Sequence, residues 1–165
     1  MKIAGLIQDS IVDGPGLRFA VFTQGCNIGC EGCHNPEAID TGGGTEVLVS
    51  DIISQMLSNP LTDGITLSGG EPFMQAADCA QLAAAARQRG LNVWVFTGNR
   101  FEDLLKRAKN DQSIDALLKS VDIMVDGPFE ISQRSLSLKW RGSKNQRILD
   151  IKKSLASGEA LEIEL

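Results

Sequence analysis

Three closely spaced cysteines limit the possible folds of this chain more than any other feature. Cys26, Cys30 and Cys33 are spaced C-x3-C-x2-C in a glycine-rich stretch, and no fourth cysteine follows nearby. A cubane iron–sulfur cluster has four irons, and each needs a thiolate or a substitute ligand. Three thiolates can therefore hold the cube and leave one iron open to a small ligand. Such an open iron favours catalysis over simple electron storage.

Zinc is the alternative metal for these thiols, with His34 as the fourth ligand. Structural zinc sites usually take pairs of ligands separated by a substantial loop. Adjacent residues 33 and 34 are poorly spaced for one tetrahedral ion, so the pattern favours a [4Fe-4S] cluster. The remaining cysteine, Cys79, shares a helical face with Leu82 and Ala86. We interpret it as a small buried apolar side chain rather than a fourth ligand.

Composition and charge argue against several classes of protein. Hydrophobic residues make up 42% of the 165 residues, as in ordinary globular domains. The net charge of −5 argues against a nucleic-acid partner, which would need a basic face. No apolar run approaches the roughly 20 residues that cross a bilayer, and no secretory signal begins the chain. We expect a single cytoplasmic domain over residues 1–165, without a membrane partner, whose reduced thiols bind metal.

Short apolar runs alternate with helical patterns along the chain, as is typical of βαβ units and a parallel sheet. The predicted strands are 18–23, 64–67, 92–97, 122–125 and 146–151. The predicted helices are 49–58, 76–89 and 101–119. Five strands are too few for a complete eight-stranded barrel, which needs about 250 residues. We therefore predict an α/β fold, a partial (open) TIM-like barrel of about five parallel strands with flanking helices.

Glycines follow the first four predicted strands, at Gly25, Gly69–Gly70, Gly98 and Gly127. Ligands bind at the carboxyl ends of strands in parallel α/β folds, so the cysteine loop lies on the ligand-binding edge. By itself a Gly-Gly pair is most often a tight turn. Beside an open-iron cluster on the same edge, a ligand-binding role is favoured. Glu71, the next residue, either orients that ligand or serves the first turn of the following helix.

Two further residues have alternative interpretations. His34 is the only histidine, and its position beside Cys33 favours a wall of the cofactor pocket over a proton shuttle. The segment Asp13-Gly14-Pro15-Gly16 leads into the first predicted strand and reads as a turn. Arg18, at the start of that strand, is either solvated or in contact with an anion.

These motifs resemble a known superfamily. C-x3-C-x2-C followed by a strand-end Gly-Gly-Glu resembles the radical S-adenosylmethionine superfamily. DGPGLR at 13–18 and CHN at 33–35 resemble its glycyl-radical-enzyme activase branch. VDGPF at 125–129 and LSLKWRGSKNQR at 136–147 are similar to the activating proteins of anaerobic ribonucleoside-triphosphate reductase. The resemblance extends from about Ile11 to about Asp150, nearly the whole chain.

The resemblance implies a particular chemistry. In this superfamily S-adenosylmethionine chelates the open iron, and one electron splits it into methionine and a 5′-deoxyadenosyl radical. In the activase branch that radical removes hydrogen from a backbone glycine of a partner, here the large glycyl-radical subunit of the reductase. The electron comes from an external one-electron donor such as flavodoxin. The protein itself binds, orients and shields the reacting groups.

Carried over by position, the resemblance also implies roles for individual residues. Cys26, Cys30 and Cys33 are the cluster ligands, and Gly70 faces the methionine portion of S-adenosylmethionine. Met124 lines the same cavity. The full set of implied cofactor-binding residues is Gly32, Cys33, His34, Gly69, Gly70, Glu71 and Asp126.

Two departures from the resemblance and three alternative functions remain. Phe96-Thr97-Gly98-Asn99 lacks the aspartate that related pyruvate formate-lyase activases carry before this turn, which argues against a monovalent cation there. Gly32 stands where an aromatic residue is common. The alternatives are an activase of another glycyl radical enzyme, a small-molecule radical enzyme such as a deazaguanine synthase, and an electron carrier. Electron carriers usually complete the cluster with four cysteines.

Overall fold

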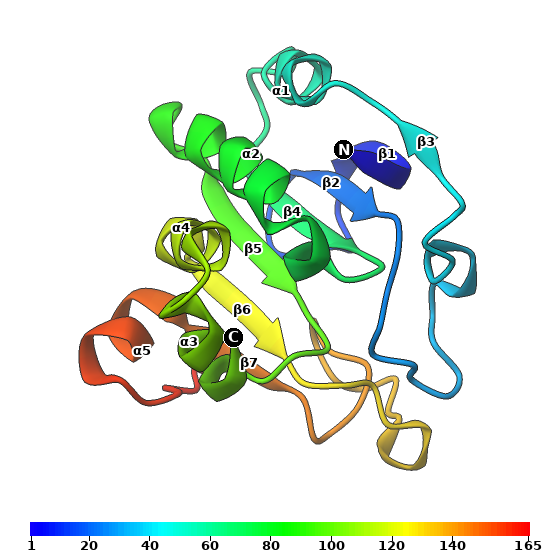
Figure 1. Ribbon diagram of the computed structural model, residues 1–165, viewed down its shortest axis with the longest axis vertical. Coiled ribbons are helices and arrows are strands. Elements are labelled where there is room, and N and C mark those ends of the chain that lie inside the picture. The colour runs from blue at the N-terminus through cyan, green and yellow to red at the C-terminus, as the bar shows by residue number, and fades with distance from the viewer.

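One mixed sheet of seven strands organises the chain, in the order β3-β1-β2-β4-β5-β6-β7. The computed structural model describes residues 1–165 (Figure 1). The central strands β2, β4, β5 and β6 run parallel to one another. On one side β1 and β3 extend the sheet antiparallel, and on the other side β7 does so. The strands are β1 Lys2–Ser10, β2 Arg18–Thr23, β3 Thr45–Glu46, β4 Gly64–Gly69, β5 Asn92–Phe96, β6 Ile123–Asp126 and β7 Arg147–Asp150.

All five α-helices lie along one face of this sheet (Figure 1). They form a single layer, in which α2 packs against α1 and α4, and α4 packs against α3 and α5. None is long and apolar enough to cross a membrane. The helices are α1 Val49–Met56, α2 Ala76–Gln88, α3 Phe101–Ala108, α4 Gln112–Ser120 and α5 Ile151–Ser157.

The two faces of the parallel strands differ in what covers them. Successive side chains of a strand point to opposite faces. In β5, Val93 and Val95 therefore join the 24-residue core beneath the helices, whereas Trp94 belongs to a small cluster on the opposite face. Cys79 of α2 is fully buried in the larger core, which confirms its predicted role as a small apolar side chain. The opposite face has no helical layer, and this leaves room for a cavity.

The predicted α/β class is confirmed, but the number of parallel strands was wrong. Four strands run parallel, and β7 pairs antiparallel with β6. Parallel pairing needs a crossover connection, usually a helix. Residues 127–146 between β6 and β7 contain only one 3-10 turn, Ile131–Gln133, so β7 returns in the opposite direction. The sheet is open, and a partial TIM-like barrel is not confirmed by it.

The first strand of the sheet was missed from the sequence. Most side chains of β1 are exposed or half-buried, and its pairing with β2 is interrupted by two register shifts. The regular alternation of buried and exposed residues that marks a strand is therefore weak here.

The predicted helix 101–119 was also wrong, because the segment forms two helices, α3 and α4. The carboxylate of Asp111 starts the second helix by accepting hydrogen bonds from the backbone N–H groups of Ser113 at 2.9 Å and Ile114 at 3.2 Å. Such a side-chain cap stabilises a new helix start. The predicted helices 49–58 and 76–89 are confirmed as α1 and α2 within two residues.

Candidate functional site

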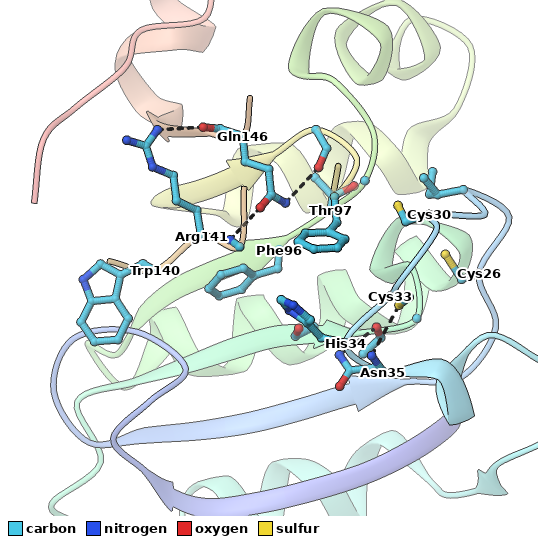
Figure 2. Close-up of a pocket in the computed structure, with 18 of the residues that line it drawn as sticks. Cys26, Cys30, Cys33, His34, Asn35, Phe96, Thr97, Trp140, Arg141 and Gln146 are labelled. Atoms are coloured by element: carbon cyan, nitrogen blue, oxygen red, sulfur yellow. Dashed lines mark hydrogen bonds between the residues drawn. The ribbon is translucent and has the colours of Figure 1, made fainter. Parts of the chain in front are cut away.

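A cavity of about 460 Å³ lies at the carboxyl ends of the parallel strands, where the sequence predicted a ligand-binding edge (Figure 2). Phe22 of β2, Ser68 of β4 and Phe96 of β5 line it from the face of the sheet that the helices leave uncovered. The other lining residues come from the segments 26–39, 69–70, 97–98 and 127–146, together with Val12 and Asp13.

The cysteine loop forms one end of this cavity. It leaves β2 through Gly25, whose φ of 96° is a left-handed conformation that favours glycine. Backbone hydrogen bonds from Gly25 to Ala38 (2.8 Å) and from Cys26 to Ile39 (3.0 Å) close the loop at its base. All three cysteine thiols are free, half-buried and line the cavity. Figure 2 shows their sulfur atoms gathered at the same end.

The donor set of this loop fits a [4Fe-4S] cluster. No three His, Cys, Asp or Glu side chains converge on a point where they would hold a single metal ion. A tetrahedral zinc needs all its sulfur ligands about 2.3 Å from one ion. In a cluster each thiolate binds a different iron, so three thiols spread around the end of a cavity suit it better.

Burial raises the pKa of the Cys30 thiol above its ordinary value, and the backbone N–H of Phe129 opposes this only in part. A bound metal centre supplies the positive charge that a buried thiolate lacks. His34, as predicted, forms a wall of the cavity, where its ring lies 4.6 Å from the ring of Phe129.

The Gly69–Gly70 pair serves both as a tight junction and as cavity wall. A Cβ at Gly70 would lie 2.3 Å from the carbonyl oxygen of Gly25 and 2.7 Å from that of Ala38. The backbone N–H of Gly70 donates to Thr23 at 2.7 Å, which fixes the end of β4 against the start of the cysteine loop. Gly69 and Gly70 both line the cavity. Only glycine allows this close approach.

Glu71 does not line the cavity. Its carboxylate is buried and accepts hydrogen bonds from Thr97 Oγ1 (2.8 and 2.9 Å), Gly98 N (3.0 Å) and Phe73 N (3.0 Å). Glu71 caps the 3-10 helix Pro72–Gln75 that leads into α2, which is close to the second sequence interpretation, although the first turn of α2 itself begins at Ala76. Burial raises the pKa of Glu71 despite these hydrogen bonds. The residue ties the ends of β4 and β5 together beneath the cavity.

Met124 and Asp126 also lie away from the cavity, contrary to expectation. Met124 is part of the core beneath the helices. Asp126 is fully buried, accepts from Phe101 N at 2.8 Å, and forms an ion pair with Arg147 at 2.5 Å. Its oxygens are therefore used to join β6, β7 and α3. Both residues point inward because β6 is buried on both faces. The sequence pattern of a buried strand does not distinguish such positions from positions that line a cavity.

Arg18 is neither solvated nor bound to a carboxylate. It is fully buried, and its guanidinium donates to Thr66 Oγ1 at 3.0 Å, to Ile65 O at 2.5 Å and to the side chain of Asn92. It also lies over the ring of Trp94. Burial lowers its pKa to about 10. The predicted anionic contact is absent, because neutral oxygens take its hydrogen bonds.

Residues 127–146, which join β6 to β7, form a segment that we call the strap. The sequence pattern assigned no structural role to this segment. Gln146 organises it by accepting from the backbone N–H groups of Gly142 (2.8 Å) and Ser143 (3.2 Å) and donating to Gly127 O (3.1 Å). Phe96 and Trp140 complete the apolar part of the cavity wall. In β5, aromatic rings at positions 94 and 96 alternate with valines, and this was the available signal for a second apolar face that the helices do not cover.

Comparisons with known proteins agree with this geometry. Residues 12–149 match the family model described as a 4Fe-4S single cluster domain. The chain is 33% identical over 148 residues to the anaerobic ribonucleoside-triphosphate reductase-activating protein of Haemophilus influenzae, covering 84% of this chain and 90% of the relative. The protein of the same name from Vibrio cholerae is 34% identical, with the same coverage. Pyruvate formate-lyase 1-activating enzyme of Escherichia coli is 32% identical over 95% of this chain but 65% of its own length.

Proposed function

The chain belongs to the family of anaerobic ribonucleoside-triphosphate reductase-activating proteins, and on that premise we propose that it generates the glycyl radical on the large subunit of such a reductase. It is an activating enzyme of the radical S-adenosylmethionine type, with a [4Fe-4S] cluster and S-adenosylmethionine as cofactors. The observation that carries the proposal is the meeting of three thiols and glycine-lined strand ends in one cavity.

In this proposal Cys26, Cys30 and Cys33 hold the cluster, and the backbone of Gly32 to His34 surrounds the adenine. When bound, the cluster and S-adenosylmethionine supply a one-electron cleavage that yields a 5′-deoxyadenosyl radical. The side chains of this chain add no acid or base to that step. Their part is to bind the groups, orient them and exclude water from the cavity.

The strand ends have a matching part in the proposal. Gly69 and Gly70 leave space for the methionine portion, because neither carries a side chain into the cavity. Glu71 and Asp126 act indirectly. The hydrogen bonds of Glu71 to Thr97 and Gly98 fix two cavity-lining positions, and the ion pair of Asp126 with Arg147 anchors one end of the strap.

The surroundings of the reaction are part of the same proposal. We expect residues 1–165 to act as one radical S-adenosylmethionine domain, a partial TIM-like barrel whose open side the reductase subunit covers when it presents its glycine. The electron would come from an external donor such as flavodoxin, and the setting would be the cytoplasm. The net charge of −5 argues against a nucleic-acid partner.

Anaerobic reconstitution tests the proposal. The purified protein is loaded with iron and sulfide, reduced, and given S-adenosylmethionine, and 5′-deoxyadenosine is measured. Wild type should release it, and Cys30→Ala should not. Adding the large reductase subunit should then give a glycyl radical signal in electron paramagnetic resonance. Absence of cleavage in wild type, or normal cleavage in Cys30→Ala, would contradict the proposal.

Activation of pyruvate formate-lyase is the second candidate, since its activating enzyme matches 95% of this chain. The match covers only 65% of that relative, whereas the reductase-activating relatives are covered to 90%. The match to nearly the full length of the reductase-activating relatives therefore favours the reductase as the protein that this chain activates. Offering both proteins in the same resonance experiment separates the candidates, and we expect the radical on the reductase alone.

A further inference from the structure

Hydrogen bonds fix the base of the strap, whereas its tip has no regular structure. At the base, Asn145 donates to Pro128 O at 2.8 Å, and the backbone N–H of Glu130 donates to Ser143 Oγ at 3.2 Å. Backbone hydrogen bonds from Lys144 to Gln133 and from Ser135 to Gly142 join its two arms. The tip, which we define as residues 134–141, carries no helix or strand. The whole strap has a single 3-10 turn, and connections longer than about 12–15 residues without secondary structure of their own are often functional.

The tip presents large side chains at the end of the cavity opposite the thiols. Figure 2 shows Trp140 and Arg141 well separated from the three cysteines. Trp140 has a φ of 59°, which is costly for a bulky residue, and its ring meets Trp94 edge-on at 6.1 Å. Leu136 borders the cavity and is 90% exposed, and Val12, which also borders it, is 75% exposed. These two apolar side chains mark the mouth.

The tip and the arm that follows it are strongly basic in an acidic chain. Residues 134–147 contain five of the sixteen lysines and arginines and no aspartate or glutamate. Arg147 is neutralised by Asp126 and Glu102. Arg134, Lys139 and Lys144 are exposed and form no ion pair. Nothing in the fold requires these cations, so they are available to a partner.

We propose that the strap tip, together with Lys144 in the arm that follows it, is the docking surface for the large reductase subunit. In this arrangement Leu136 is an apolar anchor, and Arg134, Lys139 and Lys144 face carboxylates of that subunit. The inference rests on the proposed function, because a glycine that reacts inside the cavity must pass the mouth that the tip borders. A few residues that become buried at the centre of an interface supply most of its energy, and complementary charges speed association and fix the orientation. The tip offers both at the one place that the partner has to reach.

Binding of the large subunit to the reconstituted holoprotein tests this surface. Lys139→Glu should slow association several-fold at low salt, and the effect should fade at high salt. Leu136→Asp should raise the dissociation constant about 10-fold or more, mainly through faster dissociation. Lys109→Glu is the matched control, because Lys109 is also exposed, forms no ion pair and lies after α3 in the helical layer. It should bind like wild type.

Cleavage of S-adenosylmethionine without the large subunit separates the possible outcomes. Normal uncoupled cleavage in Lys139→Glu together with weaker binding supports the docking surface. Binding of both tip variants like wild type would overturn it, and so would a defect confined to reduction by the electron donor. An equal loss of uncoupled cleavage in Lys139→Glu would also overturn it, because the tip would then belong to the cofactor site. If wild type itself fails to bind or to form a glycyl radical, the proposed function fails instead.

Discussion

The two faces of the parallel strands give the same residue type opposite properties. On the helical face, Cys79 is fully buried among apolar side chains, and burial raises its pKa far above the ordinary value. At the carboxyl edge of the opposite face, Cys26, Cys30 and Cys33 are half-buried around a cavity. A thiol becomes a ligand where the thiolate is accessible and can be stabilised, and it is inert where neither holds. Position relative to the sheet therefore decides the role of each cysteine.

The largest expected effect tests whether the cysteines on the two faces differ in this way. Cys30→Ala should reduce cluster iron and 5′-deoxyadenosine formation at least 100-fold, because two thiolates from the loop cannot hold the cube. Cys79→Ala should keep full iron content and lower the free energy of unfolding by about 1 kcal/mol through the small void it leaves. Iron and sulfide analysis and urea unfolding measure the two quantities. Loss of iron in Cys79→Ala would show that the helical face contributes a ligand.

A second pair of variants compares a glycine at the crowded cavity edge with a glycine that has open space around it. Gly70→Ala brings a Cβ to 2.3 Å from the carbonyl oxygen of Gly25, and a backbone carbonyl cannot move as a flexible side chain does. We expect a loss of about 3 kcal/mol in unfolding free energy and loss of cleavage activity. In the control Gly5→Ala, the new Cβ has no atom within 4 Å, so stability should be unchanged. Equal stability of both variants in urea unfolding would contradict the tight junction between β4 and the cysteine loop.

Much of the fold could be predicted because hydrophobic patterns are local. The runs at β2, β4 and β5 are short and rich in apolar and β-branched residues, and their positions were predicted to within two residues. Strand direction is not local. Whether β7 runs parallel or antiparallel depends on the path of residues 127–146 across the sheet. The hydrophobic periodicity of the sequence does not reveal this path. The break between α3 and α4 depends on the single cap at Asp111.

The parts of the site that form one continuous sequence motif were predictable. The parts that depend on contacts between residues distant in sequence were not. The spacing of the cysteines and the glycines after each strand identified the cavity edge. By contrast, the carboxylate of Glu71 turns away from the cavity because Thr97 and Gly98, in the turn after β5, donate to it. Asp126 likewise meets Arg147 across the sheet. Such partners are distant in sequence, so a single chain gives no sign of them.

The third prediction concerns the buried carboxylate beneath the cavity edge. Thr97→Val removes the hydroxyl that donates to both oxygens of Glu71. Leaving a buried charged group short of a donor should cost roughly 1–3 kcal/mol of unfolding free energy at pH 7. Thr45→Val on the exposed edge strand β3 is the control and should change stability by less than about 0.5 kcal/mol.

The pH dependence of this deficit follows from the direction of the pKa shift. Burial raises the pKa of Glu71 in the folded protein, so the folded state takes up its proton at a higher pH than the unfolded chain. Lowering the pH through that raised pKa therefore adds stability at this site. Loss of the Thr97 donor raises the pKa further. The gap between wild type and Thr97→Val should thus shrink on acidification, and a gap independent of pH in urea unfolding would contradict a charged Glu71 at neutral pH.

The smallest effect is expected at Glu102, a carboxylate in the first turn of α3 whose side chain is 46% exposed. Hydrogen bonds from Arg147 lower its pKa, the opposite direction to Glu71. Its contribution is therefore present at neutral pH and is lost as the pH falls through the lowered folded-state pKa. Solvent screens this pair, so Glu102→Gln should cost no more than about 0.5 kcal/mol at pH 7, fading in acid. The exposed Glu159→Gln provides the baseline in the same urea titrations. A loss well above 1 kcal/mol, comparable to breaking the buried pair of Asp126 and Arg147, would mean that the anchor of the strap extends to the surface of α3.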